Sequence, residues 1–301
     1  IRDLSGKYTV MQSSLAAAER VFALLDIKEL DAPAEATAGE AMDRRDPPPE
    51  NDRQAAAVEF RSVEFRYRAN APVLRGVSFA VRPGETIAVV GATGAGKTTV
   101  TSILQRFYEI ESGSVFVGGV DIREQPVNAL RRRFAMVQQD VFLFAGTLLE
   151  NVALGDSEPD RDRAKMALQR VGAWQLIGVD RQGLETPVGE RGSRLSAGER
   201  QLVAFARALY RDPEILILDE ATASVDSETE ARLQSATETL LEGRSAIVID
   251  HRLSTVQRAD RILVFHHGQI SEQGTHEELL ARDGIYAHLY RLQLAPPEVW
   301  A

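Results

Sequence analysis

The chain has 301 residues, about the length of two average domains, and carries a formal net charge of −9. Its 26% charged and 44% hydrophobic residues are typical of a globular protein and exclude a wholly disordered chain. The absence of cysteine excludes disulfides, zinc–thiolate sites and thiol nucleophiles, and the acidic balance disfavours nucleic acid as a partner. No stretch approaches the roughly 18 consecutive apolar residues that a membrane-spanning helix needs. Because the chain starts at Ile1 without a signal-peptide pattern, we expect it to be a fragment.

The first 57 residues divide into a predicted helix and a predicted linker. Residues 1–26 carry an apolar stripe at alternating steps of four and three, which predicts one helix. The stripe consists of Leu4, Tyr8, Met11, Leu15, Ala18, Phe22 and Leu25. A lone helix cannot bury such a stripe, so it packs either on the core of this chain or on helices that the chain lacks. Residues 27–57 are rich in proline, alanine and charged residues, which predicts a flexible linker.

A globular pattern runs from Val58 to about Gln293. Alternation of apolar and polar residues predicts exposed strands at 58–60, 63–65 and 77–81. Short apolar runs predict buried strands at 86–90, 215–218 and 246–249. Helical stretches lie between them, one with an apolar face of Leu202, Phe205, Ala206 and Leu209. Strands interleaved with helices predict an α/β core with a parallel sheet.

The end of the globular part has two local signals. The segments 261–265 and 269–272, joined by His266, His267 and Gly268, predict a hairpin. Thr275 followed three residues later by Glu278 is a capping box that opens the last helix.

The segment after the run 86–90 fits the phosphate-binding pattern G-x4-G-K-[ST]. It comprises Gly91, Ala92, Thr93, Gly94, Ala95, Gly96, Lys97 and Thr98, with Thr99 next. Glycines let backbone N–H groups turn toward phosphate oxygens, and the following helix N-terminus adds its positive dipole end. Lys97 suits the β- and γ-phosphates, and the Thr98 hydroxyl suits Mg²⁺. The strand before the loop and the helix after it favour this interpretation over an ordinary glycine-rich turn.

The buried run 215–218 ends in two acidic residues, Asp219 and Glu220. Asp219 suits a Mg²⁺ contact through water, and Glu220 would lie beside the γ-phosphate and polarise the attacking water. A solvated acidic turn is the alternative, and the presence of the phosphate-binding loop disfavours it.

The segment 195–201 carries two compatible signals. Ser196 followed by Glu199 is a capping box, which predicts a helix start. The same residues resemble Leu-Ser-Gly-Gly-Gln, the signature of the ATP-binding-cassette (ABC) family, and the order of phosphate loop, signature and acidic strand is that family's order. Ala197 replaces the first glycine and Glu199 the glutamine. We expect both changes to be tolerated, because alanine adds one methyl group and capping turns Glu199 back toward Ser196.

The resemblance covers essentially the whole globular part and implies further site residues. Tyr67 matches the aromatic residue that stacks on adenine, with an ordinary strand-edge aromatic as the alternative. Gln139 matches the glutamine that reaches Mg²⁺ and couples to the membrane part. His251 matches the switch histidine that contacts the γ-phosphate. The loop that crosses the dimer interface is matched by Ser224 and Asp226.

Two segments resemble exporter-type cassettes in particular. Residues 186–192 resemble a segment that touches the coupling helices of the membrane domain, with a surface loop as the alternative. Residues 1–26 resemble the cytoplasmic end of an exporter's last transmembrane helix. The resemblance therefore implies a soluble fragment of an integral membrane protein, at the cytoplasmic face of a bacterial inner membrane.

The fold implied is a P-loop NTPase core of α/β class, with an antiparallel β subdomain and a helical subdomain at about 140–212 that carries the signature. The ATP-binding domain would span 58–293, with a tail at 294–301. It would hydrolyse ATP with Mg²⁺ between two cassettes of identical or different chains, and so power transport by an attached transmembrane domain. On this account Ser196, Ala197, Gly198 and Glu199 face the ATP held by the partner cassette.

Three other functions share the motif order. A chromosome or DNA-repair ATPase needs a long coiled coil between the phosphate loop and the signature, and Lys97 and Ser196 are only 99 positions apart. A regulatory cassette that binds ATP without hydrolysing it is disfavoured by the presence of Glu220 and His251. An importer ATPase is disfavoured by the segment 186–192 and by the N-terminal helix.

Overall fold

The computed structural model describes residues 19, 55–68, 71–138, 140–178, 182–219, 227–249 and 253–294. The chain divides into two units, Ile1–Pro49 and Glu50–Ala301. Of the first unit only Glu19 is described, and it lies in a helix. The predicted N-terminal helix, linker and C-terminal tail therefore lie outside the described residues, apart from Glu19 and a few residues at their edges.

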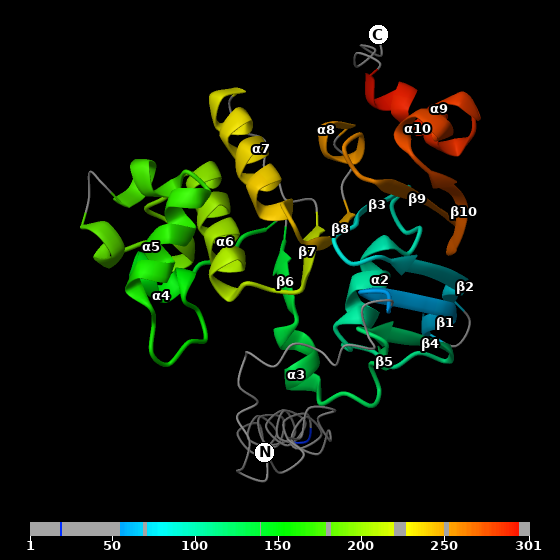
Figure 1. Ribbon diagram of the computed structural model, residues 1–301, viewed down its shortest axis with the longest axis horizontal. Helices are drawn as coiled ribbons and strands as arrows, with labels where there is room; N and C mark the ends of the chain where they lie inside the picture. The colour runs from blue at the N-terminus through cyan, green and yellow to red at the C-terminus, as the bar shows by residue number, and fades with distance from the viewer. Residues whose placement is uncertain are drawn as a thin grey trace, which may run out of the picture. The chain divides into compact units, whose positions relative to one another are not determined.

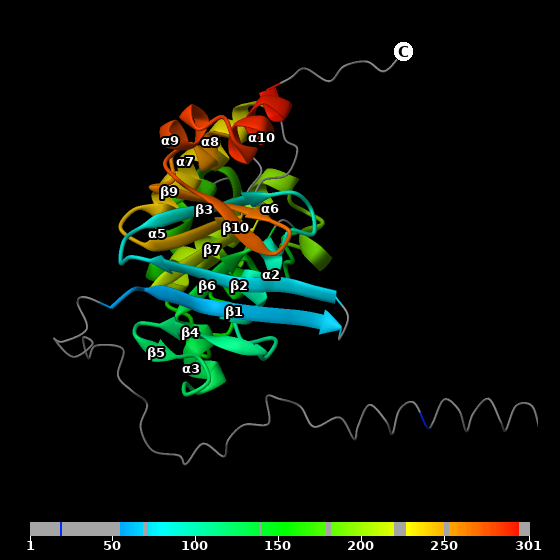
Figure 2. The same ribbon diagram turned by 90° about the vertical axis from the view of Figure 1, so that its right-hand side faces the viewer.

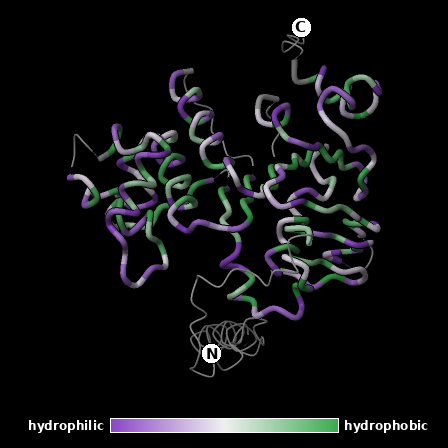
Figure 3. Tube along the Cα trace, viewed as in Figure 1, coloured by the Kyte–Doolittle hydropathy of each residue, from purple (hydrophilic) through white to green (hydrophobic). Residues whose placement is uncertain are grey.

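A six-stranded sheet forms the centre of the second unit, in the order β10-β9-β3-β8-β7-β6. Its strands are β3 (Thr86–Gly91), β6 (Phe134–Val137), β7 (Ile215–Asp219), β8 (Ser245–Ile249), β9 (Arg261–His266) and β10 (Gln269–Gly274). Neighbours from β9 to β6 run parallel, and β10 pairs antiparallel with β9. The three predicted buried strands and the terminal hairpin are confirmed. In Figure 3 this sheet contains much of the hydrophobic (green) trace, because its central strands are buried.

An antiparallel sheet lies beside it, in the order β2-β1-β4-β5. Its strands are β1 (Val58–Arg68), β2 (Ala71–Val81), β4 (Ser112–Val117) and β5 (Val120–Asp121). The sequence predicted two separate strands at 58–60 and 63–65, and that division is wrong. One strand runs through both, because Ser62 takes a φ of +47° and its N–H donates to the Ser78 hydroxyl at 2.8 Å. The pairing register shifts there, so the strand bends without ending.

Helix α2 (Lys97–Leu104) lies between the two sheets (Figures 1 and 2). Its buried Val100, Ile103 and Leu104 belong to the same apolar cluster as residues of β1 and β3. Apolar surface from two sheets thus fixes the helix that follows the phosphate loop.

Between β6 and β7 the described chain is largely helical and lies at the left of Figure 1. Its apolar cluster also includes residues of β6, β7, β8 and α7 (Ser227–Leu241). The elements of this part are α4 (Leu148–Val152), α5 (Arg161–Arg170), the π-helix η2 (Trp174–Gly178), the 3₁₀ turns η3 (Gly183–Glu185) and η4 (Glu190–Gly192), and α6 (Ala197–Arg211). The apolar face predicted from Leu202 to Leu209 is buried in this cluster. The predicted helical region that carries the signature is confirmed.

The remaining helices are α3 (Val127–Arg132), α7 (Ser227–Leu241), α8 (Leu253–Val256), α9 (His276–Ala281) and α10 (Ile285–Leu294). Helix α9 begins with the predicted capping box of Thr275 and Glu278. The prediction that this box opens the last helix is wrong, because α10 follows α9. In the described part of the chain, no helix combines the length and the apolar character required to span a bilayer.

Candidate active site

The phosphate-binding loop leads from the buried end of β3 into α2. Gly91 has a φ of +147°, and a Cβ there would lie 2.2 Å from the carbonyl oxygen of Phe265 in β9. Gly96 has a φ of +106°, and its Cβ would lie 2.8 Å from Cδ2 of Leu74. Any side chain at Gly91 would displace the neighbouring strand. The sequence analysis explained this glycine by its backbone conformation, and packing against β9 is a second reason for it.

The N-terminus of α2 suits a phosphate group. Gly96 is the N-cap residue and makes no side-chain capping bond, and the first turn contains no acidic residue. The first N–H groups of a helix have no acceptor within the helix and carry the positive end of its dipole. A helix start of this kind attracts an anion such as the β-phosphate of a nucleotide.

Lys97 folds its side chain back over the loop. Its Nζ donates to the carbonyl oxygens of Gly91 at 2.6 Å and Ala92 at 3.1 Å. Thr98, the next residue, is exposed. The ammonium group of Lys97 and the hydroxyl group of Thr98 thus both belong to the loop. An ammonium group suits the phosphates of a nucleotide triphosphate, and a hydroxyl group suits a cation bound to them.

Tyr67 lies near the end of β1 with 49% of its surface exposed. Its hydroxyl and the Thr99 hydroxyl are 3.2 Å apart, so one donates to the other. Thr99 is buried in the first turn of α2. The residue predicted to stack on adenine is therefore tied to the phosphate-binding helix, a contact that the sequence did not indicate.

Three strands end together beside the loop. Asp219 at the end of β7 is opposite Ile249 of β8, which is opposite Val89 of β3. Asp219 is half-buried. Because parallel strands share a carboxyl edge, the strands that lead into Glu220 and His251 finish at the edge where the phosphate loop begins. The predicted residues outside the described part of the chain are Gln139, Glu220, Ser224, Asp226 and His251.

The oxygen donors at this edge fit a magnesium ion that is held largely by a nucleotide. Thr98 offers a hydroxyl and Asp219 a carboxylate, and both are hard oxygen ligands. Within the described ranges no group of three or more His, Asp or Glu could hold a metal ion by itself. Magnesium commonly keeps several waters and takes phosphate oxygens as ligands, so two protein oxygens suffice.

The signature segment caps α6 as predicted. The Ser196 hydroxyl accepts from the Glu199 N–H at 3.2 Å, and the Glu199 carboxylate accepts from the Ser196 N–H at 2.7 Å. The carboxylate that replaces the usual glutamine is thus turned back to its own helix start.

Gly198 is buried against α7. A Cβ at this position would lie 2.2 Å from Cγ2 of Thr229. Close packing of two helices therefore requires glycine here, whatever else the residue contacts. Helix α6 belongs to the helical part and α2 lies between the sheets, so the signature and the phosphate loop of this chain lie apart (Figure 1).

The loop 142–147 is held by a buried asparagine that the sequence analysis did not single out. Asn151 Nδ2 donates to the carbonyl oxygens of Phe144 at 2.9 Å and Thr147 at 3.0 Å, and its Oδ1 accepts from the Phe144 N–H at 2.8 Å. Arg207 of α6 donates to the carbonyl oxygens of Asn151 at 2.8 Å and Phe142 at 3.2 Å. Burial lowers the pKa of Arg207 below its ordinary value. The signature helix is thereby bonded directly to the loop.

The exporter-like segment 186–192 lies against the same loop. The Leu148 N–H donates to the Thr186 carbonyl and the Val188 N–H to the Gly146 carbonyl, both at 2.9 Å. Phe142 and Phe144 are about half exposed and pack against each other, with ring centroids 5.0 Å apart. The structure thus places the segment 186–192, whose Thr186 and Val188 are buried, beside a loop that carries two exposed aromatic side chains.

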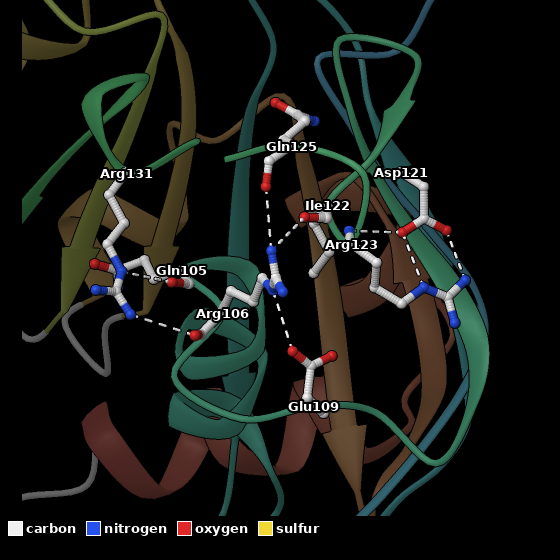
Figure 4. A network of polar contacts seen from close by, with 8 residues as sticks. All are labelled: Gln105, Arg106, Glu109, Asp121, Ile122, Arg123, Gln125 and Arg131. Carbon is white, nitrogen blue, oxygen red and sulfur yellow. Dashed lines mark hydrogen bonds and ion pairs between the residues drawn. The ribbon is translucent and has the colours of Figure 1, made fainter. Parts of the chain in front are cut away.

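The far end of α2 is anchored by arginines (Figure 4). Arg131 of α3 donates to the carbonyl oxygens of Gln105 at 3.0 Å and Arg106 at 3.3 Å. Arg106 donates to the carbonyl oxygen of Gln125 at 3.1 Å. Arg131 thus satisfies carbonyl groups left over at the C-terminus of α2, and Arg106 ties this end of the helix to the segment between β5 and α3.

The chain is similar to known proteins over most of its length. The sequence profile described as "ABC transporter" matches residues 74–223. An "ATP-dependent lipid A-core flippase" of Paraburkholderia xenovorans strain LB400 is 47% identical over 287 residues, which are 94% of this chain and 46% of the relative. The "Uncharacterized ABC transporter ATP-binding protein YknV" of Bacillus subtilis is 42% identical and covers 97% of this chain and 47% of the relative. The chain thus spans about half the length of the curated relatives it matches.

The solved structure entitled "Structure of a bacterial Atm1-family ABC exporter with ATP bound" superposes with a TM-score of 0.79 at 36% identity. It covers 96% of this chain, and the match takes up 49% of the exporter chain. The chain thus shares its fold with a solved ABC exporter structure. The chain belongs to the ABC transporter family and contains an ATP-binding domain of that family.

Proposed function

We propose that this chain hydrolyses Mg-ATP between two cassettes and so powers export by a membrane domain. The observation that carries the proposal is the shared carboxyl edge of β3, β7 and β8, where the phosphate loop, Asp219 and the strand leading to His251 meet. A nucleotide-binding loop beside an acidic strand end combines phosphate binding with the means to activate water.

The proposed roles follow the order of the site. Lys97 and the N–H groups at the start of α2 hold the β- and γ-phosphates, and Tyr67 stacks on adenine. Glu220 polarises the attacking water, while His251 contacts the γ-phosphate. Catalysis on this account is mainly positioning and charge stabilisation. Thr98, Asp219 and Gln139 would hold Mg²⁺, which neutralises charge on the phosphate oxygens when it is bound.

The signature is proposed to act on the nucleotide of a partner cassette. Within this chain, α6 begins in the helical part, away from α2 (Figure 1). Ser196 and Gly198 would therefore complete the site of an identical or different second chain, with Ser224 and Asp226 crossing the interface. ATP bound between the cassettes would hold them together, and hydrolysis would release them.

The surface formed by the exposed Phe142 and Phe144, together with the adjoining segment 186–192, is proposed to receive the membrane domain. Asn151 and Arg207 connect this surface to the signature helix, so movement of α6 would move the surface with it. On this proposal the domain works at the cytoplasmic face of a bacterial inner membrane. A coiled-coil repair ATPase is disfavoured, because the described helices between α2 and α6 are short.

Phosphate release from Mg-ATP, measured with the chain varied over several orders of magnitude in concentration, tests the proposal. A site built from two cassettes predicts that the rate per chain rises with concentration and then saturates. A constant rate per chain over the whole range would contradict the two-cassette site. Omission of magnesium is expected to abolish release at every concentration.

A further inference from the structure

We infer that Tyr108 is a positioning residue for Tyr67, and that through this contact it sets the affinity of the site for the base of the nucleotide. The inference rests on the proposed adenine-stacking role of Tyr67. Tyr108 lies four residues beyond the end of α2, in a segment to which the sequence analysis gave no role.

The ring of Tyr67 is held by two perpendicular aromatic contacts. Its centroid lies 5.0 Å from that of Tyr108 with an interplanar angle of 84°, and 4.8 Å from that of Phe65 with an angle of 90°. Phe65 and Tyr108 also contact each other, at 5.6 Å. Aromatic pairs at these separations attract through their quadrupoles, and the edge-to-face arrangement is a favoured one. The three rings therefore define the plane of Tyr67.

Tyr67 and Tyr108 nevertheless stay at the surface. Phe65 is 3% exposed, whereas Tyr67 is 49% and Tyr108 45% exposed. The Tyr67 ring is held in place, is open to solvent and lies beside the phosphate loop. Such a ring suits stacking with a purine, because it loses little conformational entropy on binding.

Tyr108 itself is fixed by the anchored end of α2. The backbone N–H of Phe107, the residue before Tyr108, donates to the Ser102 carbonyl at 2.9 Å. Arg131 holds the carbonyl groups of Gln105 and Arg106 (Figure 4). The turn that presents Tyr108 is therefore rigid.

Tyr67 is thus attached to both ends of the phosphate-binding helix. Its hydroxyl contacts Thr99 in the first turn, and its ring contacts Tyr108 beyond the last turn. This arrangement fixes the base platform relative to the phosphate loop. Loss of the Tyr108 contact should lower the affinity for the base and leave the affinity for the phosphates unchanged.

The test compares Mg-ADP with magnesium pyrophosphate, which lacks the base, by calorimetric titration of the full chain. Tyr108→Ala is expected to raise the Kd for ADP roughly three- to tenfold, the range expected for loss of one aromatic pair. The Kd for pyrophosphate should not change, and Tyr108→Phe should restore ADP binding. The double variant Tyr67→Ala, Tyr108→Ala should bind ADP no more weakly than Tyr67→Ala alone.

The neighbouring exposed ring provides the control, because Phe107→Ala removes an aromatic side chain from the same turn and is expected to leave both Kd values unchanged. If Tyr108→Ala does not fold, Tyr108→Leu keeps the apolar bulk without the ring and should also weaken ADP binding alone. An equal loss for pyrophosphate, or an equal loss in Phe107→Ala, overturns the inference. If Tyr67→Ala weakens ADP binding and Tyr108→Ala does not, the positioning role of Tyr108 is overturned, while the stacking role of Tyr67 stands. No loss for ADP in Tyr67→Ala overturns the platform itself.

Discussion

Glycines at this site are constrained by their neighbours as well as by the nucleotide. Gly91 faces a backbone carbonyl of β9, and Gly198 faces a β-branched side chain of α7. In both places an added methyl group would meet an atom at 2.2 Å. Family resemblance alone assigns such glycines to phosphate contact, whereas packing supplies a second and independent reason for them.

Gly198→Ala is expected to lower the free energy of unfolding by about 1–3 kcal/mol, because the new methyl group overpacks the contact with Thr229. Thr229→Ser removes only Cγ2, the atom in the way, and keeps the hydroxyl. Urea unfolding of the double variant should therefore recover most of the loss. A Gly198→Ala variant of unchanged stability, or one that serine does not rescue, would contradict this packing role.

Among the helices and strands, short local patterns identified three buried strands and two helix starts. The runs 86–90, 215–218 and 246–249 are buried strands, and Ser196 and Thr275 both cap helices. A short apolar run predicts burial without knowledge of its partner, so local sequence sufficed. The strands β4, β5 and β6 were not predicted. β4 begins with Ser-Gly-Ser and β5 has two residues, whereas β6 is an apolar run, Phe134–Val137, that could have been found in the same way.

Contacts between distant residues were beyond such patterns. The Tyr67 and Thr99 hydroxyls meet across 32 positions, and Arg207 reaches the Phe142 carbonyl across 65. Every residue has a backbone carbonyl group. The residue type of the acceptor therefore gives no sign of a side chain that donates to its carbonyl. The phosphate loop was predictable because its chemistry is local, whereas the supports of Tyr67 and of the loop 142–147 come from the fold.

Arg207→Ala is expected to loosen the loop 142–147. The variant removes the donor to the exposed carbonyl oxygen of Phe142 and to the partly buried carbonyl oxygen of Asn151. Loss of the partner of the Asn151 carbonyl costs about 1–3 kcal/mol. Hydrogen exchange should then accelerate at the Phe144 amide. Arg211→Ala, one turn along the same helix at an exposed position, is the control. Unchanged exchange in Arg207→Ala would show that Asn151 holds the loop without help from α6.

At the scale of the whole molecule, one arrangement explains the separation of the two nucleotide-binding motifs. The phosphate loop sits at the carboxyl edge of the central sheet, and the signature caps a helix of the helical part. A single chain therefore presents two half-sites, and the proposed function requires a second cassette to complete each. The relatives that this chain matches are about twice its length, and its structural neighbour is an exporter.

Phosphate release by Glu220→Gln shows whether Glu220 is the base that activates the attacking water. The exchange keeps the size of the side chain and removes the base that is proposed to polarise water. We expect Mg-ATP binding to be retained and turnover to fall at least about 100-fold, the usual contribution of a general base. Glu158→Gln, the same exchange at an exposed position, should behave as the unchanged chain. Loss of turnover with binding intact is the predicted result, and hydrolysis at the unaltered rate in Glu220→Gln would contradict the account.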